Sequence, residues 1–172
     1  TIHFPTNDAL RVSLGKGPLP IPLSRRQRKM QFVGCFFHGH GRQTKPLVTL
    51  SDAFENSIIG TQMLIWKDEG TVIQLGEEGA THPAGMTMIS HCVICSKPNS
   101  NTVGIKIENV ETDTPCLALF GNSFGSSDKQ LAHAVDWGTQ KRKKASWGAN
   151  AISVSKEPHI GVLPEDADVK PF

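Results

Sequence analysis

Three histidines are the residues whose types and spacing best suit chemistry in this 172-residue chain. His38 and His40 are two residues apart, so on a β-strand their imidazoles would share one face, and His91 follows further along the chain. Imidazole nitrogen is a common ligand of zinc and iron, which makes the three candidate ligands of a metal-dependent enzyme. No acidic ligand follows the pair, however, because Arg42, Gln43 and Thr44 stand there. Histidines that bond to backbone or water are therefore the preferred interpretation, and we expect no metal and no cofactor.

The other candidate groups do not predict an enzyme either. Cys92 and Cys95 have zinc-knuckle spacing, but the sequence has no second pair, and on a strand their thiols would point to opposite faces. Paired carboxylates occur only at Glu77-Glu78 and Glu165-Asp166, in expected loops. No nucleophile elbow, phosphate-binding loop or dinucleotide-binding fingerprint is present. The cysteines lie in apolar sequence, as buried reduced thiols do, which favours an intracellular setting.

Two basic clusters predict binding instead. The first cluster is Arg25, Arg26, Arg28 and Lys29, and the second is Lys141, Arg142, Lys143 and Lys144. Trp147 lies close to the second cluster. Cations contact phosphates and an indole can stack on any base, so this combination predicts binding to single-stranded nucleic acid, with RNA preferred. Two alternatives stay open: the cations are simply solvated, and the tryptophans pack a helix onto a sheet.

Composition favours one domain with irregular ends. The net charge is +2, which is too small to indicate nucleic-acid binding by itself, and 16 Gly and 11 Pro indicate many turns. We expect an extended, basic, Pro-rich arm over residues 1–30, a single domain over 31–156 and an acidic flexible tail over 157–172. No apolar run approaches the roughly 18 to 20 residues that a membrane-spanning helix needs, and we see no signal peptide and no internal repeat.

Alternating and apolar runs predict about eight strands. The clearest strand is 103–110, where Val103, Ile105 and Ile107 would face the core while Gly104, Lys106 and Glu108 face water. One helix is predicted over 128–144, from a capping box at 127–130 followed by apolar residues at helical spacing. Turns every 8 to 12 residues without strand–helix–strand alternation are typical of an antiparallel jelly roll or β-sandwich. The predicted fold is therefore all-β, with one helix.

The order of these elements resembles the core of the 30K plant-virus movement proteins. The resemblance is carried by Leu50-Ser51-Asp52 and Ile58-Ile59-Gly60, with Asp52 and Gly60 as its fixed positions, and by the later strands followed by a helix. It implies a jelly-roll core, binding of single-stranded nucleic acid, self-association, and a location in the host cytoplasm, at plasmodesmata or in the virion. A self-assembling viral coat or matrix protein fits the same pattern. The alternative of another class is a cupin-like metal-dependent enzyme that uses His38, His40 and His91.

Overall fold

The protein is described by a computed structural model that places residues 2–4, 10–12, 27–28, 31–40, 45–51, 53–80, 83–110, 112, 115–126, 128, 130–140 and 144–164. These residues form β-strands and connecting turns and contain no helix. The predicted all-β class is confirmed, but the predicted helix over 128–144 is wrong. In its place, β16 (His133–Asp136) is a strand, and β17 (Lys144–Gly148) begins where the helix was expected to end.

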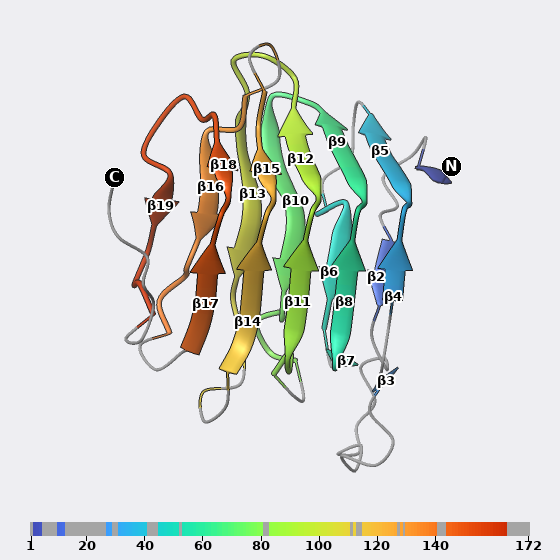
Figure 1. Cartoon of the computed structure of the whole chain (residues 1–172), viewed down its shortest axis with the longest axis vertical. Helices are drawn as coiled ribbons and strands as arrows, with labels where there is room; N and C mark the ends of the chain where they lie inside the picture. Colours follow the sequence, from blue (N-terminus) through green and yellow to red (C-terminus); the bar gives the residue numbers. More distant parts are fainter. Residues whose placement is uncertain are drawn as a thin grey trace.

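The described strands form three large parallel sheets and one short sheet of two strands (Figure 1). Sheet A contains β1 (Ile2–Phe4), β5 (Phe36–His40), β9 (Gln62–Trp66), β12 (Val93–Ser96), β15 (Ser123–Phe124) and β18 (Ala151–Ile152). Sheet B contains β2 (Leu10–Val12), β6 (Val48–Leu50), β10 (Glu69–Leu75), β13 (Asn101–Ile107), β16 and β19 (His159–Ile160). Sheet D contains β4 (Gln31–Val33), β8 (Asn56–Ile59), β11 (Thr87–Ser90), β14 (Pro115–Phe120) and β17. A short pair, β3 (Gln27–Arg28) with β7 (Ala53–Phe54), makes sheet C.

The chain passes through the sheets in the fixed order D, A, B, and each such set of three strands forms one coil that stacks on the previous coil. The fold is therefore a β-solenoid. Every described ladder is parallel, for example β10 with β13 and β11 with β14. The predicted antiparallel jelly roll or sandwich is therefore wrong. Strand alternation could not reveal this, because side chains alternate with a period of two in parallel and antiparallel sheets alike.

Each coil stacks its apolar residues directly on those of the previous coil. In sheet D, the inward column is Phe32, Ile58, Ile89, Leu119 and Trp147. In sheet A it is Phe37, Met63, Ile94, Phe124 and Ile152. Their central members are completely buried, so the core is a continuous apolar rod along the solenoid axis. The offsets between the sheet D partners, read from their numbers, are 26, 31, 30 and 28 residues, which is the repeat that the sequence analysis did not detect.

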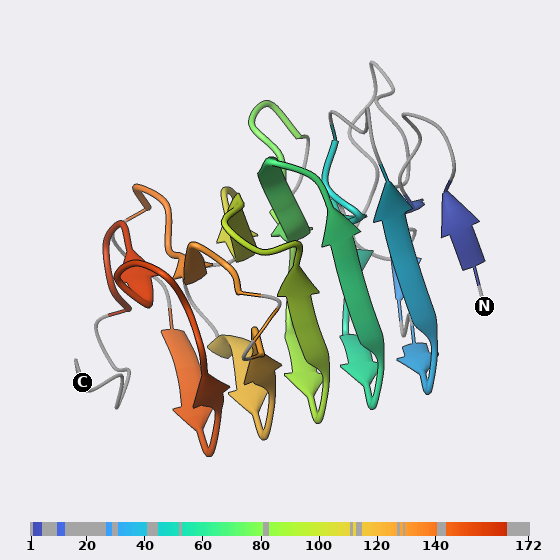
Figure 2. The ribbon, with the colours of Figure 1, turned by 90° about the horizontal axis from the view of Figure 1, so that it is seen from above.

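A tight corner joins each strand of sheet D to the next strand of sheet A. Its first residue has a positive φ at Gly34, Gly60, His91, Gly121 and Ala149, which turns the chain sharply in every coil. Figure 2 shows these corners aligned along one edge of the molecule. The following residues point inward and include Asn122, which is buried and satisfies backbone groups of the preceding coil.

The predicted strand 103–110 is largely confirmed, since β13 buries Ile105 and Ile107 and turns Lys106 outward. Its first half differs from the prediction. Gly104 faces inward, where an added Cβ would lie 3.0 Å from Leu131 and 3.2 Å from Phe124, while Val103 is only half-buried. The alternation of buried and half-buried residues therefore shifts by one position at Gly104, because Gly104 and Ile105 are consecutive and both are buried.

Candidate functional site

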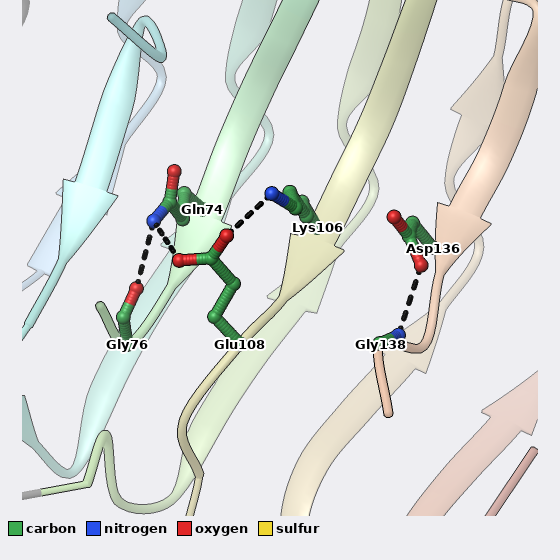
Figure 3. A network of polar contacts seen from close by, with 6 residues as sticks. All are labelled: Gln74, Gly76, Lys106, Glu108, Asp136 and Gly138. Atoms are coloured by element: carbon green, nitrogen blue, oxygen red, sulfur yellow. Dashed lines mark hydrogen bonds and ion pairs between the residues drawn. The ribbon is translucent and has the colours of Figure 1, made fainter. Parts of the chain in front are cut away.

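A surface pocket lies against the outer face of sheet B, where β10, β13 and β16 end. Its volume is about 590 Å³. It is lined by Glu78, Gly79, Lys106, Ile107, Glu108, Asn109, Asp136, Gly138, Thr139 and Gly161. Several of these residues, together with the neighbouring Gln74, form the polar network in Figure 3. We call this pocket the sheet B groove.

Strand register determines which side chains reach the groove. Gln74 is paired with Lys106, and Lys106 with Asp136, so the three stand in one row across three successive coils. Neighbouring strands are about 4.8 Å apart, and parallel in-register pairing keeps the three side chains on the same outer face. Buried neighbours hold the row in place, because Ile73, Ile105 and Val135 each precede a member of it and are completely buried.

A compact network engages Glu108. Gln74 Nε2 donates to Glu108 Oε2 at 2.7 Å and to the Gly76 carbonyl at 3.1 Å. Lys106 Nζ donates to the other carboxylate oxygen of Glu108 (Figure 3). Because both oxygens of Glu108 are occupied, its side chain is held in one position, and the charge of Lys106 is compensated within the groove.

Asp136 forms the opposite wall. Its Oδ1 accepts a hydrogen bond from the Gly138 amide at 2.9 Å, and its other oxygen points away from Gly138 in Figure 3. The neighbouring coil approaches closely: a Cβ on Gly161 would lie 2.7 Å from Gly138 backbone atoms and 3.1 Å from Asp136 Oδ1. The turn after β16 thus orients the carboxylate toward the groove.

The groove carries more acceptors than cations. Glu78, Glu108 and Asp136 contribute three carboxylates, and Lys106 is the one basic side chain among the described residues of the lining. Among the described residues, no group of three or more His, Cys, Asp or Glu side chains is arranged to hold a metal ion. The arrangement therefore suits a ligand that donates several hydrogen bonds.

Of the predicted nucleic-acid residues whose side chains the structure describes, Lys144 and Trp147 do not line the groove. Six other predicted residues, Arg25, Arg26, Lys29, Lys141, Arg142 and Lys143, lie outside the described residues, as does Asp52. Arg28 is in β3, Lys144 is exposed at the start of β17, and Gly60 occupies one of the tight corners. Trp147 stacks on Phe124 with ring centroids 5.7 Å apart and meets His159 edge-on at 4.8 Å, so its indole packs at the end of the core.

The three candidate histidines belong to different places in the solenoid. His38 and His40 are in β5 of sheet A, whereas His91 occupies the corner before β12, two coils further on. Cys35, Cys92 and Cys95 are free thiols, and burial raises the pKa of Cys92, as expected for an unreactive core cysteine.

Sequence reasoning placed Lys106 and Glu108 on a solvent face but did not identify them as site residues. The missing information was register, because Gln74, Lys106 and Asp136 are separated by about one coil and come together only through parallel pairing. The offset of 30 to 32 residues between them was the available signal.

No helix among the described residues is long and apolar enough to cross a membrane. No protein-family model matches the chain, and neither a curated protein nor a solved structure is significantly similar to it.

Proposed function

We propose that the protein binds a polyhydroxylated chain, a neutral glycan, along the sheet B groove. The observation that carries the proposal is the row of Lys106 and Asp136 in the groove and Gln74 beside it, where the described carboxylates outnumber the described cations. Carboxylates accept hydrogen bonds from hydroxyl groups, a side-chain amide both donates to and accepts from them, and hydrogen bonds to charged groups are the stronger kind. An extended glycan also presents its sugars at a spacing close to the separation of neighbouring strands, so successive sugars can meet equivalent positions in successive coils.

Charge favours a neutral ligand over a polyanion. The described residues of the lining have a formal charge of −2, from three carboxylates and one ammonium. Among the described lining residues, phosphates brought into the groove would meet Asp136 and Glu78, and the one ammonium there already pairs with Glu108. The proposal is one of binding, and it assigns no catalytic step to these residues.

Affinity gel electrophoresis with soluble neutral polysaccharides tests the proposal. We expect the protein to be retarded in a gel that contains a recognised member of a panel of dextran, galactomannan, xylan and soluble β-glucan. Asp136→Ala should weaken the retardation about tenfold or more, because a charged hydrogen bond is worth about 1.5–3 kcal/mol. Asp136→Asn removes the charge but keeps an acceptor for the Gly138 amide. Comparing it with Asp136→Ala therefore separates the effect of the charge from the effect of losing the hydrogen bond that holds the turn at Gly138.

Glu69→Gln is the matched control. Glu69 is exposed on the same sheet, at the other end of β10, and does not line the groove. Its removal changes the net charge by the same amount as Asp136→Asn and should leave retardation unchanged. Equal effects of the two substitutions, or no retardation by any polysaccharide of the panel, would contradict the proposal.

Binding of single-stranded nucleic acid remains a separate prediction that rests on the basic clusters at 25–29 and 141–144. A titration with single-stranded RNA at several salt concentrations tests it, since phosphate contacts give an affinity that falls steeply with salt. The homo-oligomer expected from the sequence also remains a prediction.

A further inference from the structure

The three side chains of the row differ in the hydrogen bonds that they can still make. Gln74 Nε2 carries two N–H groups, and both are engaged, one by Glu108 and one by the Gly76 carbonyl. Its Oε1 accepts from no described residue and points away from both partners in Figure 3. Gln74 therefore offers a ligand an acceptor and no donor.

Lys106 is the donor of the row. An ammonium has three N–H groups, and Glu108 Oε1 accepts one of them. Asp136 stands in register with Lys106 on the neighbouring strand, yet the ion pair described for Lys106 is with Glu108, two residues further along its own chain segment. Among the described contacts, two N–H groups of Lys106 therefore remain for a ligand.

Asp136 supplies a second acceptor. Its Oδ1 accepts from the Gly138 amide, which leaves the other oxygen for a ligand. The row thus presents acceptor, donor and acceptor at steps of about 4.8 Å, the separation of neighbouring strands. A hydroxyl group both donates and accepts, so a neutral sugar chain satisfies all three positions. A carboxylate accepts only, so an acidic sugar would satisfy Lys106 and be repelled by Asp136.

Glu108 has a different part from the row, because both of its oxygens are already engaged, Oε2 by Gln74 and Oε1 by Lys106. Its side chain is 25% exposed, less than that of Lys106 at 36%. We infer that Glu108 is a positioning residue, which holds Gln74 and Lys106 in the acceptor–donor–acceptor pattern and offsets the ammonium charge, so that the groove selects neutral over acidic glycans. This inference rests on the proposed function. Selectivity of this kind needs a repulsive element against the wrong ligand, and Glu108 supplies it by compensating the one described cation of the lining.

Affinity gel electrophoresis with each polymer in two forms tests the inference. The probes are dextran, galactomannan, xylan and soluble β-glucan, each as the neutral polymer and as its carboxymethylated derivative. The parent protein should be retarded more strongly by the neutral form of the polymer that it recognises. Glu108→Gln should narrow this preference about fivefold or more, because it frees the charge of Lys106, and attraction between unit charges about 4 Å apart in water corresponds to that factor.

A second variant tests the donor itself. Lys106→Met removes the ammonium at similar side-chain length, so retardation by the neutral polymer should weaken about tenfold or more, and the carboxymethylated polymer should gain nothing. Glu69→Gln changes the net charge by the same amount as Glu108→Gln, on the same sheet but outside the groove, and should keep the preference of the parent. Far-UV circular dichroism should be the same for all of these variants, since each side chain is at least partly exposed.

The outcomes separate this inference from the function on which it rests. Equal weakening of both polymer forms in Glu108→Gln would mean that Glu108 only supports the local structure, which would overturn the inference and leave glycan binding intact. Full retention of neutral-polymer binding in Lys106→Met would overturn it as well, as would a parent protein that is retarded equally by the two forms. A parent protein retarded by neither form of any polymer would contradict the proposed function, and the inference with it.

Discussion

At the scale of single residues, Asn122 connects three coils. Its Oδ1 accepts from the Cys92 amide at 3.0 Å, and its Nδ2 donates to the Ile89 carbonyl at 2.8 Å and to Asn150 Oδ1 at 3.0 Å. Asn122→Ala leaves the buried Cys92 amide without its partner and removes the bond to the Ile89 carbonyl, which should cost about 1–3 kcal/mol of unfolding free energy. Urea unfolding measures this loss of unfolding free energy. Asn150→Ala, at a half-buried position, is the control and should cost about half as much or less.

His159 makes stability depend on pH. Trp137 Nε1 donates to its Nδ1 at 3.3 Å, its Nε2 is buried without a hydrogen-bond partner among the described residues, and burial lowers its pKa below 6.5. The unfolded chain therefore binds a proton at pH values where the folded chain does not. We expect unfolding free energy to be steady above pH 6.5 and to fall as pH drops from there toward the lowered folded-state pKa.

Urea midpoints at pH 7.5 and pH 5.5 check this dependence. His159→Gln should reduce the difference between the two midpoints, because the substituted residue does not titrate. His91→Gln, at an exposed corner, should retain the difference of the parent protein. An unchanged difference in His159→Gln would show that other groups cause the acid sensitivity.

At the scale of elements, a side chain in place of glycine should be tolerated less well at the turn that leads out of sheet A at Gly125 than at the corner that leads into it at Gly60. A Cβ on Gly125 would lie 2.0 Å from the Ser153 carbonyl oxygen of the next coil, at a φ of +80°. Gly60 also has a positive φ, +57°, but nothing lies within 4 Å of its Cβ position. Gly125→Ala should therefore cost more than 3 kcal/mol, from backbone strain and displacement of the next coil, whereas Gly60→Ala should cost about 1 kcal/mol. Thermal unfolding of the two variants compares these costs directly, and equal losses would contradict the explanation.

At the scale of the whole molecule, the sequence predicted where strands lie but did not predict which strands pair with each other. The alternating run at 103–110 predicted a strand that the structure largely contains. The helix was wrong because Leu131, Ala134 and Val135 fit a helical stripe, yet coil-to-coil packing buries all three in and beside a strand. Parallel register depends on residues about 30 positions apart. Since the corner residues vary among Gly, His and Ala, no identical motif marks that interval.

Coil-by-coil stacking also determines how stability is distributed along the axis. Each coil contacts only its neighbours, so a central coil is covered on both sides and the last coil on one. Ile58, Ile89 and Leu119 are completely buried, whereas Trp147, Ile152 and His159 of the last coil are half-buried. Ile89→Ala should therefore cost about 3–4 kcal/mol, and Ile152→Ala about 1 kcal/mol. Native-state hydrogen exchange should show slower exchange in β9, β10, β12 and β13 than in β18 and β19, because the last coil can open without exposing the centre of the core. Uniform protection from β9 to β19 would instead mean that the solenoid opens as one cooperative unit.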